Sequence, residues 1–323
     1  MTNALVVRGL VKAFGNHLAV DDISFEVPRG VVYGILGPNG AGKSTTLRMI
    51  NDIFAPDAGT ITVLEGLSPG PAAAQHIGYL PEERGLYPKM KVVEMIEFIG
   101  ELRGLSRAEA KRRAWRWLDR LGLAQWGKNK VQDLSKGMQQ KVQFATALIH
   151  EPALVILDEP WSGLDPINAE VLRQVVDEIR AAGRTVLFST HQMEQAEKVV
   201  DSVCIIARGK KLLDGNLKDI KRRQAGDGLI ALELGDAASR ATAETLLADK
   251  ALVAETRAPR AELGADWEVK LADGVTSQQL LAALVNAQVN VRRFEVVIPT
   301  LHQIFVDQVG ASAAVAERRP EAA

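Results

Sequence analysis

The sequence lacks the features that mark secreted and membrane-spanning proteins. It holds a single cysteine, Cys204, so no disulfide can form within the chain and no cysteine-rich metal site is available. No stretch offers the roughly 20 consecutive apolar residues that a membrane-spanning helix needs. We also find no basic and apolar N-terminal segment of the kind that directs secretion. These absences predict a soluble protein that would serve a membrane only through a partner.

An excess of charge of either sign is also missing. The 39 Lys and Arg residues balance 40 Asp and Glu residues, and the net charge of −1 gives no overall attraction to nucleic acid. One basic run, from Lys111 to Arg120, is interpreted as a solvated helix surface. We therefore expect no nucleic-acid partner. With 323 residues, of which 47% are hydrophobic, the chain can form about two globular domains.

The segment Gly37–Thr45 has the spacing G-x-x-x-x-G-K-S of a phosphate-binding loop. An apolar, strand-like run over 31–36 leads into it, and a segment with helical potential, 45–52, follows. In such a turn, backbone N–H groups and the positive end of the helix dipole face the phosphates. Lys43 can reach the β- and γ-phosphates, and the Ser44 hydroxyl can ligate magnesium. The residues predicted to bind a nucleoside triphosphate here are Gly37, Pro38, Asn39, Gly40, Ala41, Gly42, Lys43, Ser44 and Thr45.

Hydrophobic patterns divide the rest of the chain. Alternating apolar residues over 4–36 predict a small antiparallel lead-in to the strand before the loop. Residues 91–149 have the periodicity of helices. From residue 153, short apolar strands alternate with helices, which is typical of a parallel sheet with crossover helices. We expect a first domain over 1–224, with a helical subdomain at about 88–150.

A break at Gln224–Gly228 precedes a second, smaller unit. Its predicted order of elements, β-α-β-β-α-β, suits a small α+β module of the ferredoxin-like kind. We place this accessory domain at 225–310, with a final helix at Thr300–Val309. The last segment, 311–323, is predicted to be a frayed tail.

An apolar strand over Leu154–Leu157 ends in two carboxylates, Asp158 and Glu159. A parallel sheet would deliver Asp158 to the same edge as the phosphate loop, where it can hold magnesium. Glu159 can orient and deprotonate a water for attack on the γ-phosphate. His191, after a strand over 185–190, would lie at this edge and can contact the γ-phosphate.

Two further segments leave alternatives open. Phe14, on the turn between the first two strands, could pack under the sheet or stack on a base. Ser135 and Gly137 lie at the start of a predicted helix, so their amides form a second anion site. A single bound nucleotide does not need two such sites, whereas two copies of the chain facing each other would use both.

Taken together, these motifs resemble those of the ATP-binding cassette (ABC) ATPases, the motor subunits of ABC transporters, over about residues 4–222. The resemblance implies an α/β fold of the P-loop NTPase class, with an antiparallel lead-in sheet, a parallel core sheet and a helical subdomain. ATP and Mg²⁺ would be bound between two copies, with Ser135 and Gly137 of one copy completing the site of the other. By the same resemblance, Phe14 stacks on adenine, Asp165 contacts the nucleotide and His191 acts as a switch.

Two residues depart from the pattern of that family. Glu82 stands where most members have a glutamine that touches magnesium and the attacking water. Its carboxylate can still ligate magnesium, so we expect Glu82 to act both as a metal ligand and in catalysis. Lys136 stands in the second anion site where glycine is common, and we expect its side chain to point outward.

These departures and the ending over 298–310 resemble the sodium-export branch of the family, which pairs with ABC-2 type permeases. The implied function is an ATP-hydrolysing subunit that dimerises around two ATP and drives a separate integral membrane permease, an exporter. The chain would then lie on the cytoplasmic face of the membrane, with the loop Glu82–Tyr87 and the helices after it against the permease. The alternative is an ABC ATPase that acts without a permease, as a regulatory or nucleotide-sensing protein.

Overall fold

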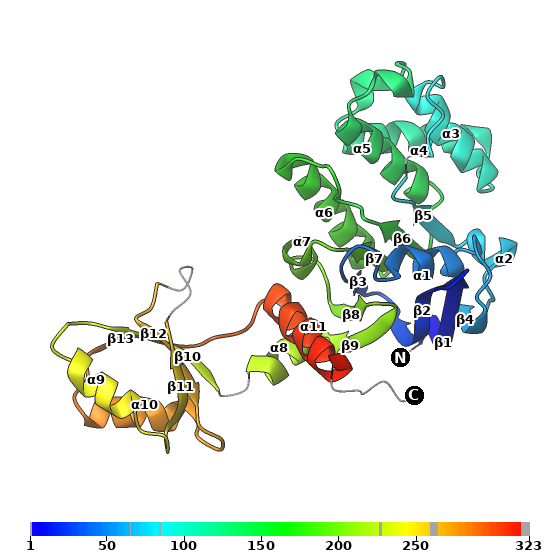
Figure 1. Cartoon of the computed structure of the whole chain (residues 1–323). Coiled ribbons are helices and arrows are strands. Elements are labelled where there is room, and N and C mark those ends of the chain that lie inside the picture. Colours follow the sequence, from blue (N-terminus) through cyan, green and yellow to red (C-terminus); the bar gives the residue numbers. More distant parts are fainter. Residues whose placement is uncertain (1, 65, 84, 226–227, 259–263, 318–323) are drawn as a thin grey trace. The chain divides into compact units, whose positions relative to one another are not determined.

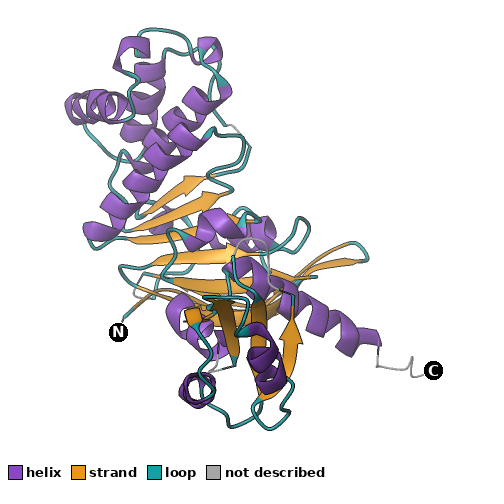
Figure 2. Cartoon of the chain, turned by 90° about the vertical axis from the view of Figure 1, so that its left-hand side faces the viewer, coloured by secondary structure: helices purple, strands orange, loops and turns teal. Residues whose placement is uncertain are grey.

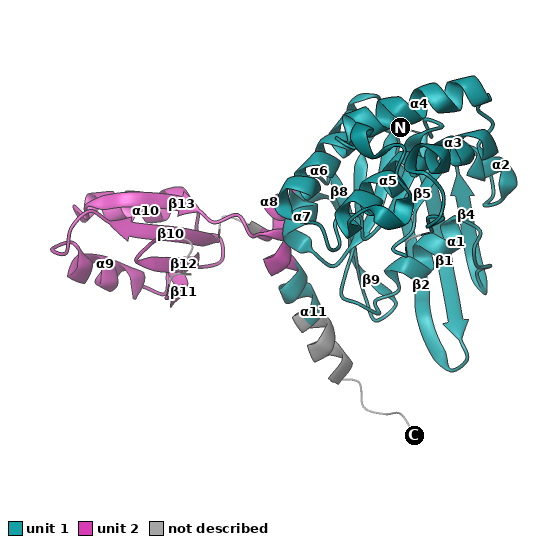
Figure 3. Cartoon of the chain, turned by 90° about the horizontal axis from the view of Figure 1, so that it is seen from above, with its two compact units in different colours: residues 1–217, 305–323 teal, residues 218–304 magenta. Residues whose placement is uncertain are grey.

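The computed structural model describes residues 2–64, 66–83, 85–225, 228–258 and 264–317. The chain divides into two compact units, residues 1–217 with 305–323 and residues 218–304 (Figure 3). Three predicted segments fall partly outside the described residues. They are the loop at Arg84, the break at residues 226–227, and the tail at residues 318–323.

A six-stranded sheet forms the centre of the first unit. In spatial order its strands are β5 (Ile77–Leu80), β6 (Leu154–Asp158), β7 (Thr185–Thr190), β3 (Val32–Leu36), β8 (Ser202–Ala207) and β9 (Lys210–Asn216). All neighbouring pairs are parallel except β8 and β9, so the carboxyl ends of β3, β6 and β7 share one edge. Every residue of these three strands is buried, as expected where both faces of a parallel sheet are covered.

A second sheet of the first unit is antiparallel and has three strands. Their order is β2 (His17–Pro28), β1 (Asn3–Phe14) and β4 (Ala58–Val63). Helix α1 (Lys43–Ile50) buries Leu47, Met49 and Ile50 in one cluster with side chains of both sheets. The predicted antiparallel lead-in and parallel core sheet are therefore both present, and they share their core with the helix that follows the phosphate loop.

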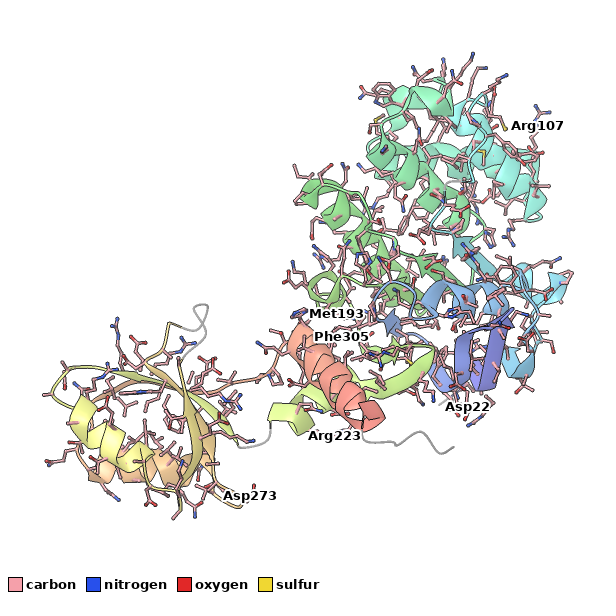
Figure 4. All side chains as sticks on the ribbon, in the orientation of Figure 1. Asp22, Arg107, Met193, Arg223, Asp273 and Phe305 are labelled. Atoms are coloured by element: carbon pink, nitrogen blue, oxygen red, sulfur yellow. The ribbon has the colours of Figure 1, made fainter. Side chains whose placement is uncertain are left out.

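Helices of the first unit fall into two groups. The helices α3 (Val92–Leu102), α4 (Arg107–Arg120) and α5 (Lys136–Leu148) gather beside the strands (Figures 1 and 2). Helix α4 begins at Arg107, which is labelled in Figure 4. Ser106 caps the start of this helix, because its hydroxyl oxygen accepts a hydrogen bond from the amide of Glu109 at 3.3 Å. This group is the helical subdomain expected of the fold. Like α1, three further helices lie between strands along the chain, and they are α2 (Pro71–Ala74), α6 (Pro166–Ala181) and α7 (Met193–Glu197).

The second unit is built around a four-stranded antiparallel sheet, and two helices connect its strands along the chain (Figure 3). The strand order is β11 (Val253–Arg257), β12 (Trp267–Leu271), β10 (Leu229–Leu234) and β13 (Val291–Val296), and the helices are α9 (Arg240–Leu247) and α10 (Ser277–Asn286). Along the chain the elements alternate as β-α-β-β-α-β. This arrangement confirms the predicted ferredoxin-like α+β module.

Two helices at the borders of the units differ from the sequence prediction. Helix α8 (Leu217–Ala225) runs across the expected boundary at residue 224, and the second compact unit begins at Lys218. Helix α11 (Leu301–Glu317) continues past the expected end at Val309. Residues 311–317 are therefore helical rather than frayed, because alanine, which is frequent here, has the strongest intrinsic preference for a helix.

Candidate active site

The phosphate loop joins the carboxyl end of β3 to the start of α1 (Figure 1), as its spacing predicts. Gly42, just before the helix, has φ of 102°, and a Cβ there would lie 2.4 Å from the carbonyl oxygen of Ala19 in β2. A Cβ at Gly37 would lie 2.1 Å from the carbonyl oxygen of Ile206 in β8. Both positions therefore need glycine, because the loop backbone passes too close to these strands for a side chain.

The Lys43 side chain is held inside the loop. Its ammonium group donates hydrogen bonds to the carbonyl oxygens of Gly37 at 2.9 Å and Pro38 at 3.1 Å. It also lies 3.6 Å from Oε1 of Glu159, and the side chain is only 6% exposed. Phosphate oxygens carry more negative charge than carbonyl oxygens and are stronger acceptors. A bound phosphate can therefore displace the carbonyls from Lys43.

Asp158 ends β6 and is fully buried behind the loop. Its Oδ1 accepts hydrogen bonds from the hydroxyl groups of Ser44, at 3.1 Å, and of Ser189. Its Oδ2 has no hydrogen-bond partner among the described residues. Burial raises the pKa of Asp158, and the hydrogen bonds from Ser189 and Ser44 oppose that shift. A buried carboxylate oxygen without a partner is costly, and a cation beside it would remove that cost.

The oxygen atoms at this point suit magnesium. Mg²⁺ prefers oxygen ligands and is usually held by one or two carboxylates together with phosphates of the substrate. The Ser44 hydroxyl and the Asp158 carboxylate offer oxygens 3.1 Å apart. Within the described part of the chain, no group of three or more His, Cys, Asp or Glu residues could hold a metal by itself. The phosphates of a nucleotide would therefore have to complete this site.

Glu159, the next residue, forms hydrogen bonds with residues at the end of the neighbouring strand β7. Its φ of 48° lies in the left-handed region that residues other than glycine rarely adopt. Its Oε2 accepts a hydrogen bond from Oγ1 of Thr190 at 2.9 Å. Its Oε1 accepts from the amide of His191 at 3.1 Å and contacts Nδ1 of that residue at 2.9 Å. The structure thus brings Glu159 and His191 into direct contact, with backbone strain of the kind that gathers at functional sites.

A cleft of about 540 Å³ opens over the loop. The predicted residues that line it are Phe14, Asn39, Gly40, Ala41, Gly42, Lys43, Ser44, Thr45, Glu82, Glu159 and His191. The ring of Phe14 is 45% exposed and makes an edge contact with Phe54, with 5.6 Å between ring centroids. Phe14 is therefore not packed under the sheet, and part of its ring is available to a planar base.

Glu82 reaches the cleft from the loop after β5. Gln143 of helix α5 donates hydrogen bonds to the carbonyl oxygens of Pro81 and Glu83, both at 3.1 Å. These bonds hold the loop on either side of Glu82 and couple its position to that of α5. Gln143 was not predicted, although α5 buries two glutamines, Gln140 and Gln143, among apolar residues, and a buried polar side chain indicates such a role.

Besides Gly37, Pro38 and Asp158, which belong to the loop and to the end of β6 but do not line the cleft, three predicted residues at the starts of helices are also absent from its lining. Ser135 precedes α5 and accepts a hydrogen bond from the amide of Met138 at 3.3 Å, and Gly137 follows in the first turn. Asp165 precedes α6 and accepts from the amide of Asn168 at 2.9 Å, which holds the pKa of Asp165 below its usual range. None of the three lines the cleft of its own chain. Lys136, beside Ser135, is exposed.

Other residues of the site were not predicted. His17 and Ala19 of β2 line the cleft beside the phosphate loop. Ser189 and Thr190 at the end of β7 form hydrogen bonds with the two carboxylates. A signal for the second pair was present in the sequence, because two polar residues end a strand whose centre is apolar.

Both parts of the chain are similar to known protein families. A family model described as ABC transporter matches residues 20–162. The ABC transporter ATP-binding protein YhaQ of Bacillus subtilis (strain 168) is 38% identical over 307 residues, which cover 95% of this chain and 99% of that protein. The chain belongs to the ABC transporter ATP-binding proteins. A second model, described as the C-terminal domain of DrrA1-3-like ATP-binding proteins, matches residues 215–309.

Other ABC proteins match over much of the chain. The daunorubicin/doxorubicin resistance ATP-binding protein DrrA of Streptomyces peucetius is 32% identical over 312 residues, or 96% of this chain and 93% of that protein. A solved structure of an ATP-binding subunit of an ABC transporter is 34% identical, with a TM-score of 0.64. The matched region covers 69% of this chain and 93% of the solved chain. The fold is therefore the predicted ABC ATPase fold. Across the described ranges, no helix combines the length and apolar character needed to cross a membrane.

Proposed function

We propose that this ABC protein binds ATP with Mg²⁺ and hydrolyses it in a homodimer that encloses two ATP. The cycle drives a separate integral membrane permease, an ABC-2 type exporter, from the cytoplasmic face of the membrane. One observation carries the proposal. The carboxylates of Asp158 and Glu159 lie against the phosphate loop. The Ser44 hydroxyl donates a hydrogen bond to Asp158 at 3.1 Å, and the Lys43 ammonium group lies 3.6 Å from Glu159.

Binding depends on the residues that line the cleft. Amide groups of the loop receive the phosphates, and Lys43 exchanges its carbonyl partners for phosphate oxygens. The exposed ring of Phe14 stacks on adenine. Ser44 and Asp158 hold Mg²⁺, and Glu82 offers a further carboxylate in the same cleft. When bound, the ion neutralises part of the charge on the phosphates.

Hydrolysis depends on Glu159 as the general base. Its carboxylate accepts a proton from a water whose oxygen bonds to the γ-phosphorus, while the bond to the bridging oxygen breaks and ADP leaves. His191 contacts Oε1 of Glu159 at 2.9 Å, and its side chain is 41% exposed at the cleft. This contact and this exposure support a role for His191 next to the base, where it can also reach the γ-phosphate.

A second copy supplies the groups that one chain leaves outside its own cleft. Ser135, Gly137 and Asp165 stand at the starts of α5 and α6 and do not line the cleft beside the loop. The start of α5 presents backbone N–H groups and the positive end of the helix dipole to a facing nucleotide. Their separation from the cleft supports a dimer in which each copy completes the site of the other.

Export through a permease is supported by relatives and by an exposed aromatic surface. One relative is named for daunorubicin/doxorubicin resistance, and another, from Cupriavidus metallidurans, for Nod factor export. Tyr87 is 54% exposed and meets the ring of Phe98 in α3 edge to face, with 6.0 Å between centroids. This pair gives the loop after Glu82 and the following helix an apolar surface that a permease can cover.

The substitution Glu159→Gln tests the catalytic part. We expect ATP turnover to fall at least about 100-fold, the range lost with a general base, while ATP still binds and a dimer accumulates. Glu170→Gln, an exposed glutamate of α6, serves as the control and should keep normal turnover. Full turnover in Glu159→Gln would contradict the assignment of the base.

Co-purification with membrane proteins and steady-state ATPase assays test the permease part. We expect an integral membrane protein to co-purify and to change the turnover rate when it is present. A chain that hydrolyses ATP alone and retains no membrane partner would instead be a regulatory or nucleotide-sensing ABC ATPase.

A further inference from the structure

The carboxylate of Glu159 is held entirely by neighbouring groups of the same site. Thr190 Oγ1 lies 2.9 Å from Oε2, while the amide of His191 and its Nδ1 lie 3.1 and 2.9 Å from Oε1. Lys43 adds an ammonium group 3.6 Å from Oε1. The Glu159 side chain is 6% exposed. The two oxygens of the carboxylate therefore have different numbers of hydrogen-bond partners.

The two oxygens of Glu159 differ in how many of their acceptor positions are filled. An ionised carboxylate only accepts hydrogen bonds and has about two acceptor positions on each oxygen. Two donors from His191 fill both positions of Oε1, and the Lys43 charge lies on the same side. Oε2 accepts one bond, from Thr190, among the described residues. One position of the carboxylate therefore stays open, and it is on Oε2.

The direction of the Thr190 hydrogen bond is also determined. Its Oγ1 accepts a hydrogen bond from the amide of Gln192 at 3.1 Å. A hydroxyl group has a single proton, and Oε2 of Glu159 has none when ionised, so that proton must point to Oε2. The Thr190 side chain is 1% exposed, which keeps water from taking over this role.

We propose that Thr190 is a positioning residue for ATP hydrolysis, whose hydroxyl turns Glu159 so that the open position of Oε2 receives the proton of the attacking water. The role rests on the proposed ATPase function. In the step, an O–H bond of water breaks and its proton goes to Oε2. The oxygen bonds to the γ-phosphorus, and the electron pair of the broken phosphorus–oxygen bond leaves with ADP.

The substitution Thr190→Val removes the hydroxyl while nearly keeping the shape of the buried side chain. We expect a roughly 10-fold fall in kcat, because even a small displacement of a reacting group slows the chemical step. The KM for ATP and the affinity for a non-hydrolysable ATP analogue should stay within about twofold, because Thr190 does not line the cleft. Thr190→Ser keeps the hydroxyl and should restore most of kcat.

Thr185→Val is the matched control. Thr185 begins the same strand, is 2% exposed, and accepts a hydrogen bond from the amide of Gly30 at 3.0 Å. It loses the same hydroxyl far from Glu159, so kcat should be unchanged even if the melting temperature falls. If Thr190→Val does not fold, the comparison of Thr190→Ser with Thr190→Ala makes the same test.

Two results would overturn the inference while leaving the proposed function intact. One is wild-type kcat in a folded Thr190→Val or Thr190→Ala protein. The other is a Thr190→Ser protein as slow as the variants without a hydroxyl. An inactive wild-type protein would instead contradict the proposed ATPase function itself, and the positioning role with it.

Discussion

Alanine at two glycines of the phosphate loop should have very different effects on stability. Gly40 has φ of 76° and is exposed, and a Cβ added there meets nothing within 4 Å. Gly42 has φ of 102° and is buried, and a Cβ there would lie 2.4 Å from the carbonyl oxygen of Ala19. Both substitutions place a side chain on a left-handed backbone, but only Gly42→Ala also forces a steric clash with β2.

The magnitudes follow from these two terms. A left-handed conformation costs alanine about 1–2 kcal/mol, so Gly40→Ala should destabilise the protein by about that amount. Overpacking against a fixed backbone adds about 1–3 kcal/mol, so Gly42→Ala should cost about 2–5 kcal/mol. For a unit of this size, each kcal/mol corresponds to roughly 2–4 °C in melting temperature. Gly42→Ala should thus melt clearly below Gly40→Ala.

Urea unfolding followed by circular dichroism, with a thermal melt of each variant without nucleotide, provides the measurement. The difference between the variants reports mainly the contact with Ala19, because both carry the strain of a positive φ; the φ of 102° at Gly42 lies further from the left-handed region and adds to the same difference. ATP binding should also weaken more in Gly42→Ala, since the clash displaces the start of α1. Equal stability of the two variants would refute the claim that the closeness of β2 is what demands glycine at position 42.

Two other perturbations have expected outcomes. Phe14→Ala should weaken ATP binding by about 1–2 kcal/mol, or roughly 5- to 30-fold in Kd, whereas Phe98→Ala should not; equal affinities by calorimetry would mean that the base does not stack on Phe14. Burial, together with the charge of Arg103, lowers the pKa of His150 to about 4. Between the ordinary value near 6.5 and that value, the unfolded chain binds a proton that the folded chain does not, so folding stability falls as the pH drops. His150→Gln should remove about 1 kcal/mol of the stability loss between pH 7 and 5, the exposed His76→Gln should not, and an unchanged pH dependence in His150→Gln would disprove the burial argument.

Much of the fold was predictable because the signals were local. The glycines and lysine of the phosphate loop stand at fixed spacing between an apolar strand and a helix, and Asp158 and Glu159 follow an apolar run directly. The order of elements in the second unit also follows from the alternation of apolar patterns along the chain. Boundaries were less accurate, as α11 shows, because helix ends depend on weak preferences of a few residues.

The partners of the carboxylates were not predictable, because they depend on strand register. Asp158 of β6 lies opposite Ser189 of β7, which is far away in the sequence. That register puts Thr190 and His191 next to Glu159. A shift by one residue would turn these side chains to the other face of the sheet. Gln143 was missed for a related reason, since the docking of α5 brings it to the loop of Glu82.

By itself, the sequence determined which reactive groups the protein has and that they stand at the loop and at the ends of strands. A second anion site at Ser135 and Gly137 stays a prediction from the sequence. Only the tertiary structure decided which carboxylate oxygens keep an open acceptor position. Oδ2 of Asp158 has no hydrogen-bond partner among the described residues, and Oε2 of Glu159 accepts one hydrogen bond, from Thr190. The physical reason is that hydrogen bonds between adjacent strands are set by register and packing, and these join residues that the sequence holds far apart.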